Sequence, residues 1–224
     1  MLAMTSVEPV EMHDVLNWSR LLDQYGLASF GWGITWTDGA RLFRYRSVLG
    51  IREDATAEHA LRGMTMTRGF IHLRRPSRMS TIGHLNAQPY QSPDARWAFA
   101  HNGYFDRYRE YVAAYRSELQ GTSDSEIGFL LCRDQLSQGL SLEESLKETH
   151  RLLEGKANLM ALDRDGRLAV YAGNPENPLF TFSVGTIHMA TTSLHSPDHF
   201  LFDTIFPSAS SITRLPLGVS LLVP

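Results

Sequence analysis

Residues 97–104 read Trp-Ala-Phe-Ala-His-Asn-Gly-Tyr, an apolar run that ends in an Asn-Gly pair. A short apolar run of this kind predicts a buried strand, which we place at Trp97–His101. Asn-Gly favours a tight turn with a positive φ angle, and this is one interpretation of Asn102 and Gly103. The other is an oxyanion hole, in which the Asn102 amide and the Gly103 backbone N–H point together at a developing negative oxygen.

The elements predicted around this run alternate in blocks. Strand-like runs come first, at 30–36, 41–47 and 69–73, with Asp38-Gly39 as the turn signal between the first two. Helices are predicted at 57–66, 104–119, 126–136 and 142–153, the last of which opens with a Ser141–Glu144 capping box. Strand-like runs return at 158–162, 167–172, 179–182, 186–190 and 219–223. This order predicts an antiparallel α+β fold and not a doubly wound parallel sheet.

Composition limits the classes of function. The chain has 224 residues, 43% of them hydrophobic, and a formal net charge of −3, which fits one globular domain over residues 1–224 and no nucleic-acid partner. The Pro/Gly-rich stretch 173–178 is a loop, because it is too short for a domain linker. The apolar runs fall short of the roughly 20 residues of a membrane span, and no secretory signal opens the chain. We therefore expect a cytoplasmic protein with no membrane partner.

Polar residues gather where apolar runs end. Strand alternation along 69–75 puts His72 and Arg74 on one face, and the planar fork of an arginine suits a carboxylate. A plain surface arginine is the alternative. Ser123–Glu126 fits a second capping box, whereas the functional interpretation uses Asp124 as the partner of an ammonium group. Arg74 and Asp124 together would hold an α-amino acid zwitterion.

Metal and thiol chemistry find less support in the sequence. His195 and His199 have the i, i+4 spacing of a metal pair, but Pro197 lies between them and no third ligand is evident. Cys132 is the single cysteine, which excludes an internal disulfide framework and a Cys-based zinc cluster. Its apolar helical surroundings favour a buried structural thiol. No metal and no cofactor are expected.

Taken in order, five segments resemble the class II glutamine amidotransferase domain, a branch of the N-terminal nucleophile (Ntn) hydrolases, over nearly the whole chain. Any one of these motifs is weak, but five in the family's order form a specific signal. The segments are Gly31–Ile34 (an early glycine-containing strand), His72–Arg74 (His-x-Arg), Asn86–Pro89 (Asn-x-His-Pro), His101–Gly103 (His-Asn-Gly, matched outright) and Ser123–Glu126 (Thr-Asp-Ser/Thr-Glu).

The resemblance implies an Ntn-hydrolase-like fold, a four-layer αββα sandwich of two antiparallel sheets. It implies that Arg74 binds the α-carboxylate of glutamine, that Asp124 binds its α-amino group, and that Asn102 and Gly103 form the oxyanion hole. His101 is grouped with the substrate-binding residues. In such enzymes an N-terminal cysteine attacks the side-chain amide, with its own α-amine as the base. A γ-glutamyl thioester and ammonia result, and water then frees glutamate.

The resemblance also implies the partners. The ligand is glutamine or a γ-glutamyl small molecule. The length of the chain leaves no attached synthetase domain, so ammonia either passes to a separate ammonia-accepting synthetase or is released by a stand-alone amide hydrolase. A homodimer is one option for the assembly.

The family's nucleophile is not among the residues given. Family members open like Met-Cys-x-Leu-Leu-Gly/Ala-x-Ser/Thr, and Met1–Thr5 aligns with the stretch that begins two residues after the cysteine. The cysteine is therefore expected two residues before Met1. Three explanations stay open: a start at an internal methionine, a pseudoenzyme that binds without cleaving, or a replacement nucleophile such as Thr5 or Ser6. The strand register argues against the third.

Further departures concern the pocket. Gln88 stands where the family has His, and Pro76-Ser77 stands where synthetase-linked members often carry Ala-Thr. Arg75 and Arg78 add positive charge beside the carboxylate site, which suggests a γ-glutamyl compound larger than glutamine. The expected function is hydrolysis of the side-chain amide of glutamine or of such a compound. The alternative is a non-catalytic binding or regulatory module that keeps the pocket.

Overall fold

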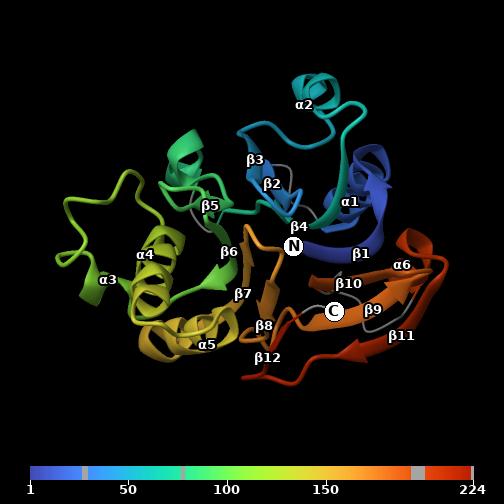
Figure 1. Cartoon of the computed structure of the whole chain (residues 1–224). Helices are drawn as coiled ribbons and strands as arrows, with labels where there is room; N and C mark the ends of the chain where they lie inside the picture. Colours follow the sequence, from blue (N-terminus) through green and yellow to red (C-terminus); the bar gives the residue numbers. More distant parts are fainter. Residues whose placement is uncertain (27–29, 77–78, 193–199, 223–224) are drawn as a thin grey trace.

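Two antiparallel sheets form the centre of the computed structural model, which describes residues 1–26, 30–76, 79–192 and 200–222 (Figure 1). Among these residues the larger sheet has seven strands in the order β11-β9-β10-β1-β4-β2-β3. In chain order its strands are β1 (Leu2–Glu11), β2 (Trp32–Thr37), β3 (Leu42–Ser47), β4 (Thr65–Leu73), β9 (Leu179–Val184), β10 (Ile187–Thr192) and β11 (Ala209–Arg214). The smaller sheet has the order β12-β8-β7-β6-β5, with strands β5 (Tyr90–Gln91), β6 (Trp97–Tyr104), β7 (Lys156–Asp163), β8 (Leu168–Tyr171) and β12 (Ser220–Leu222).

Helices cover the outer faces of both sheets. On the larger sheet these are α1 (Met12–Gly26), α2 (Ala55–Ala60) and α6 (Phe200–Ile205). On the smaller sheet α4 (Asp124–Ser137) and α5 (Leu142–Leu153) pack side by side, and the short α3 (Tyr108–Tyr111) lies against α4 (Figure 1). Two 3₁₀ turns, η1 (Met79–Thr81) and η2 (His84–Asn86), lie in the connection from β4 to β5. No helix in the described ranges has the length and apolar content needed to cross a membrane.

Strand alternation separates the interior into three apolar layers. In β1, Leu2 packs toward the helices of the larger sheet, whereas Ala3 faces the other sheet. In β6, Phe99 packs toward α4 and α5, whereas Ala98 and Ala100 face the larger sheet. Small alanines at the sheet-to-sheet contact let the two sheets approach closely. The layers therefore run helix, sheet, sheet, helix, and the expected αββα architecture is confirmed.

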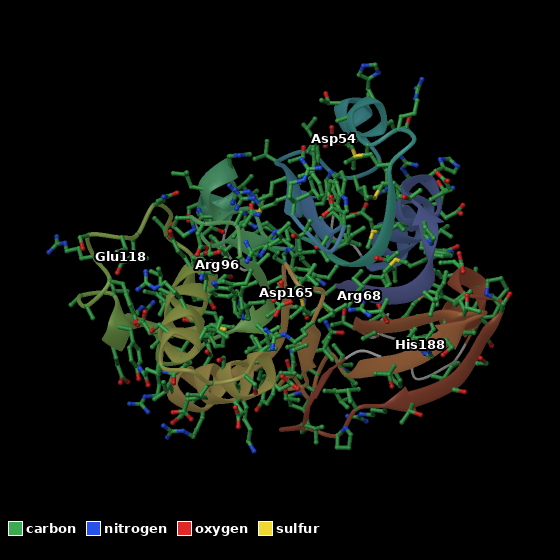
Figure 2. The ribbon with its side chains drawn as sticks, viewed as in Figure 1. Asp54, Arg68, Arg96, Glu118, Asp165 and His188 are labelled. Atoms are coloured by element: carbon green, nitrogen blue, oxygen red, sulfur yellow. The ribbon has the colours of Figure 1, made fainter. Side chains whose placement is uncertain are left out.

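Hydrogen bonds also join the two sheets at one end. The Arg68 guanidinium in β4 donates to the Gly166 carbonyl oxygen at 3.1 Å, and Thr37 Oγ1 in β2 donates to the Arg164 carbonyl oxygen at 2.7 Å. Arg68 lies beside Asp165, at the turn between β7 and β8 (Figure 2). These bonds connect strands of the larger sheet to a hairpin of the smaller one, so they fix how the sheets are stacked.

Most of the predicted elements are confirmed, with boundaries shifted by a few residues. The predicted helix 104–119 is wrong, because β6 continues through Tyr104 and only Tyr108–Tyr111 is helical. The predicted helix 57–66 overruns, because α2 ends at Ala60 and β4 begins at Thr65. The prediction did not include α1 or the first strand as elements. The polar residues of α1 break up its apolar pattern, and Pro9 interrupts the pattern of β1.

The capping box that opens α5 is confirmed, and its contribution to the free energy of unfolding can be measured. Ser141 Oγ accepts the Glu144 backbone N–H, and the Glu144 carboxylate accepts the Ser141 backbone N–H. We expect Ser141→Ala to lower the free energy of unfolding by about 1 kcal/mol, because the Glu144 backbone N–H loses Ser141 Oγ as its acceptor and the Glu144 carboxylate loses the Ser141 hydroxyl as a donor. Urea denaturation measures this. Ser137→Ala, an exposed serine at the end of α4 that caps no helix start, is the matched control. Equal stabilities of the two variants would contradict the assignment.

Candidate active site

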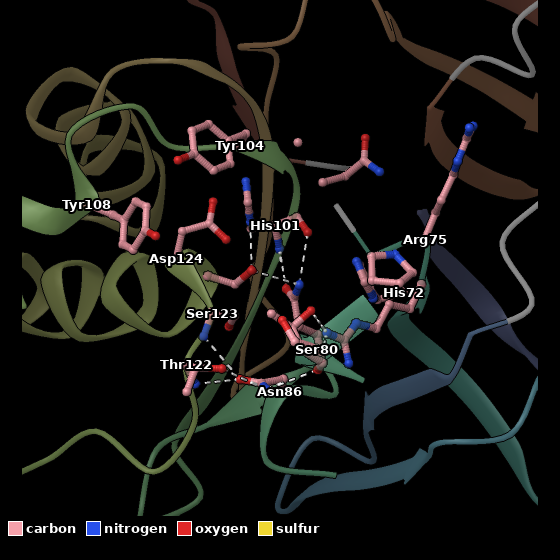
Figure 3. A pocket seen from close by; sticks show the side chains of 17 residues that line it. His72, Arg75, Ser80, Asn86, His101, Tyr104, Tyr108, Thr122, Ser123 and Asp124 are labelled. Carbon is pink, nitrogen blue, oxygen red and sulfur yellow. Dashed lines mark hydrogen bonds between the residues drawn. The ribbon is translucent and has the colours of Figure 1, made fainter. Parts of the chain in front are cut away.

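A cavity of about 310 Å³ opens where β4, β6 and the start of α4 meet (Figure 3). Asp124 and Tyr108 lie on one side of it, and His72 and Arg75 lie on the other (Figure 3). The cavity is lined by the motif residues of four segments that are far apart in the sequence. They are His72, Arg74, Asn86, Gln88, His101, Asn102, Gly103, Ser123 and Asp124.

The end of β4 provides the cationic side of the cavity. His72 and Arg74 both line it, whereas Leu73 between them packs into the core with α1, as strand alternation predicts. Gly33 of β2 pairs with His72. A Cβ at Gly33 would collide with the Gln88 carbonyl oxygen, so glycine is required where the 86–89 loop crosses this strand.

Arg74 lines the cavity and is held in place by Thr81, which also lines it. Its Nη2 donates to the carbonyl oxygen and to Oγ1 of Thr81, at 2.6 and 2.9 Å. The residue is only 7% exposed, and none of the salt bridges among the described residues involves it. Burial lowers the pKa of the Arg74 guanidinium, yet an arginine keeps its charge at any ordinary pH. A nearly buried cation without a carboxylate is a ready site for an anionic ligand group.

The start of α4 provides the anionic side. One oxygen of Asp124, Oδ2, accepts the Phe105 backbone N–H at 2.9 Å. The predicted second capping box is wrong, because Ser123 makes no capping bond and pairs instead with the Tyr90 hydroxyl at 2.8 Å. Glu126 accepts the backbone N–H groups of residues 120 and 121. Both residues thus brace the loop before α4, and Asp124 remains at the cavity wall.

The end of β6 brings Asn102 and Gly103 to the same cavity. Gly103 has a φ angle of 138°, and a Cβ there would collide with the Lys156 carbonyl oxygen of the neighbouring strand. Only glycine fits this position. The expected turn is wrong, because the pair stays in the strand and continues the ladder with β7. Asn102 Oδ1 accepts a hydrogen bond from Asn177 Nδ2 at 2.7 Å.

Gln88 and Asn86 hold the cavity walls together. Gln88 Oε1 accepts the His101 backbone N–H at 2.6 Å, and its Nε2 donates to the His101 carbonyl oxygen and to Ser125 Oγ. Asn86 Oδ1 accepts the backbone N–H groups of Thr122 and Ser123, at 2.8 and 3.1 Å. The 86–89 loop is therefore bonded to both β6 and α4. A glutamine at position 88 satisfies this geometry where the resemblance would have a histidine.

Two histidines in the cavity wall are buried and neutral. Burial lowers the pKa of His72 well below its usual value, and the positive charges nearby act in the same direction. Burial also lowers the pKa of His101, although the Asp124 carboxylate opposes this effect. His101 stacks on Phe105 at a centroid distance of 4.3 Å and pairs with Ser125 Oγ at 2.9 Å. His101 is thus packed into the wall, with only 3% of its surface exposed.

The other sequence candidates lie elsewhere. Cys132 is fully buried in α4, and burial raises the pKa of its thiol to about 12, so the prediction of a structural thiol is confirmed. Arg75 lines the cavity and is exposed, whereas Arg78 lies outside the described residues. His195 and His199 also lie outside them. Among the described residues, no cluster of three metal-ligating side chains occurs.

Comparison with known sequences decides the family. The sequence model of the class-II glutamine amidotransferases matches residues 1–197. The chain belongs to this family. Among curated relatives, the chain is 29% identical to the glutamine–fructose-6-phosphate aminotransferase of Bacillus subtilis over 163 residues. It is 27% identical to the corresponding enzyme of Halalkalibacterium halodurans over 165 residues. Each match covers 70% of this chain but only 26% of the relative.

Solved structures show the same fold. The glutamine phosphoribosylpyrophosphate amidotransferase of Bacillus subtilis superposes with a TM-score of 0.77 at 20% identity, over 99% of this chain and 46% of that one. A class-II glutamine aminotransferase domain protein from Silicibacter pomeroyi superposes with a TM-score of 0.63 at 16% identity, over 99% and 93% of the two chains. The family and the Ntn-type fold expected from the five motifs are therefore confirmed.

The two neutral histidines predict how stability depends on pH. Their folded-state pKa values lie below the ordinary value of 6.5, so the unfolded chain binds protons that the folded protein does not. Their contribution to stability is present above about pH 6.5 and is lost as the pH falls. We expect the free energy of unfolding to drop as the pH falls below 6.5, by at most about 1.4 kcal/mol per pH unit for each histidine. Denaturant titrations between pH 7.5 and 5 measure this slope.

A variant isolates the share of one histidine. His101→Asn places an amide near Ser125 Oγ and does not titrate. Its slope should be shallower than the parent's, by up to about 1.4 kcal/mol per pH unit, because all other groups are common to both proteins. Parallel slopes would show that His101 is not held neutral.

Proposed function

We propose that this protein hydrolyses the side-chain amide of glutamine, or of a γ-glutamyl compound, and that residues 1–224 form one amidotransferase-type domain. One observation carries the proposal. One cavity of about 310 Å³ is lined by a cation that has no ion-pair partner within the described part of the chain, by a carboxylate and by two potential oxyanion donors, which come from β4, α4 and β6. This arrangement suits a small zwitterion with an amide at its far end.

Arg74 and Asp124 form the proposed clamp for the amino acid. The Arg74 guanidinium binds the α-carboxylate through its fork of N–H donors, while two hydrogen bonds to Thr81 fix the orientation of the fork. The Asp124 carboxylate accepts the α-ammonium group, and its bond to the Phe105 backbone N–H fixes its position. The histidines between these two charges are neutral, so they add no cation that would compete with the ammonium group.

The register of β1 supports a position for the proposed nucleophile. Leu2 pairs with Ile71 and Ala3 pairs with Phe70, so a residue two positions before Met1 falls opposite Arg74. The Met1 nitrogen is buried and donates to Thr192 Oγ1 at 3.0 Å, and burial lowers the pKa of an amino group there to about 5. A peptide N–H suits such a site better than an ammonium group does. Thr5 lies farther along the strand, opposite Arg68.

The proposed reaction has two steps. The thiol of an N-terminal cysteine attacks the amide carbon, its proton passes through the cysteine's α-amine to the leaving nitrogen, and ammonia departs. During the attack, the carbonyl oxygen becomes negative and is stabilised by the Asn102 amide and the Gly103 backbone N–H. Water then attacks the γ-glutamyl thioester, which releases glutamate and restores the thiol. Ammonia leaves for water or for a separate acceptor enzyme.

Glutaminase activity of two chains tests this proposal. One is the chain as printed, and the other is the same chain preceded by Met-Cys-x, with removal of the initiator methionine verified by mass. We expect glutamate and ammonia in equal amounts from the second chain and from the second alone. A Ser in place of the added Cys is the matched control.

No release by the Cys-first chain, on glutamine or on γ-glutamyl amides, would overturn the hydrolase proposal. The second candidate function, a binding module, would then be favoured by the cavity itself, because the Arg74 and Asp124 sites are built in either case.

Ligand affinity tests the clamp without turnover. We expect Arg74→Ala to weaken glutamine binding to the printed chain by about 2–5 kcal/mol, because the ligand carboxylate loses a desolvated partner. Isothermal titration calorimetry measures the change. Arg75→Ala removes the same charge from the exposed rim of the cavity and should cost far less. Equal losses in the two variants would remove Arg74 from the binding site. If Arg75→Ala weakened the binding of larger γ-glutamyl ligands only, this result would indicate that Arg75 contacts the substituent on their amide.

A further inference from the structure

The oxyanion donor in this cavity has a side-chain partner from a distant loop. Asn177 lies in the connection between β8 and β9, 75 residues after Asn102, and its Nδ2 donates to Asn102 Oδ1 at 2.7 Å. An amide whose oxygen is occupied in this way must present its NH₂ group elsewhere. Asn102 lines the cavity, so its Nδ2 is the atom left for a ligand.

The loop that carries Asn177 is held by a fully buried asparagine. Asn158 of β7 donates to the Asn177 carbonyl oxygen at 2.7 Å, and its own Oδ1 accepts the backbone N–H groups of Gly173 and Asn174 at 3.1 Å. Asn158 is also the residue that pairs with Asn102 in the β6–β7 ladder. The ladder and the loop therefore meet at Asn102. Three bonds to the Asn158 side chain hold the loop, and one of them is made to Asn177 itself.

The direction of the Asn177–Asn102 bond follows from the cost of burial. As arranged, the pair leaves one buried acceptor, Asn177 Oδ1, without a partner among the described residues. The reversed pair would place the NH₂ group of Asn177 at that buried position, where two N–H donors would need acceptors instead of one oxygen needing a donor. Buried donors without partners are rarer in proteins than under-satisfied carbonyl oxygens, and each costs its desolvation free energy. The arrangement that points the Asn102 NH₂ group into the cavity is thus the favoured one.

We propose that Asn177 is a positioning residue, which fixes the Asn102 amide so that its N–H donors face the developing oxyanion. This rests on the proposed function, because it assigns Asn177 a part in the same amide hydrolysis. Asn177 touches neither the substrate nor the reacting atoms. It acts by occupying the one atom of Asn102 that would repel a negative oxygen.

The test uses Asn177→Asp in the Cys-first chain. A carboxylate at this position can only accept, so it draws the Asn102 NH₂ group toward itself and turns Asn102 Oδ1 into the cavity. We expect kcat for glutamine to fall by about 10²–10³-fold, as when an oxyanion donor is lost. KM should change less than about threefold, because the Arg74 and Asp124 contacts are untouched. A merely structural role would not separate kcat from KM in this way.

Asn174→Asp is the matched control. Asn174 lies in the same loop, where its Oδ1 accepts the Glu176 backbone N–H at 3.0 Å, and an aspartate keeps that bond while it adds the same charge. Its kcat should stay within about threefold of the parent value. A parent-like kcat for Asn177→Asp, or an equal loss in both variants, would overturn the proposal. Thermal unfolding of both variants shows whether the fold is intact.

A second measurement separates this proposal from the hydrolase proposal. If the unmutated Cys-first chain shows no activity, the proposed function fails, and amide proton exchange of the Asn102 side chain still decides the role of Asn177. In the parent protein these protons face the cavity, so NMR should show that they exchange rapidly with solvent. In Asn177→Asp one of them binds the carboxylate and should exchange at least tenfold more slowly. Unchanged exchange would overturn the assignment of Asn177.

Discussion

The structure depends on the antiparallel pairing of β6 with β7, which continues without a break through Asn102 and Gly103. Because Gly103 lies against the Lys156 carbonyl oxygen at a positive φ angle, the strand can keep its hydrogen bonds where a side chain would end them. The backbone that builds the smaller sheet is therefore the same backbone that places Asn102 and Gly103, the proposed oxyanion donors, at the cavity. Rigid strand atoms position a catalytic group more accurately than loop atoms do.

The charges of the cavity are arranged around this ladder. Arg74 comes from the other sheet and Asp124 from a helix end, so their separation is set by how the layers stack. Gln88 joins the layers, since its amide bonds to both main-chain polar groups of His101 and to Ser125 on α4. The neutral state of the histidines follows from the same dense packing. Stability and ligand recognition thus draw on one set of contacts.

Local sequence patterns predicted the parts of this protein that local forces decide. The β2–β3 hairpin, the α5 capping box and the alternation of His72 and Arg74 depend on neighbouring residues and were predicted correctly. Residues 104–119 were predicted as a helix, but Tyr104 pairs with β7 and only Tyr108–Tyr111 is helical, limits that the composition of the segment does not mark. Asn177 gave no signal either, since an asparagine in a Pro/Gly-rich loop is ordinary. Only the folded chain brings it to Asn102, 75 residues away.

The burial of Cys132 has a practical consequence for chemical biology. It is the single thiol of the printed chain, and its pKa of about 12 leaves almost no thiolate at neutral pH. A thiol-directed electrophilic probe therefore leaves Cys132 unlabelled at neutral pH. In a chain that begins with cysteine, one label per molecule reports the terminal thiol alone, without any need to remove the native cysteine.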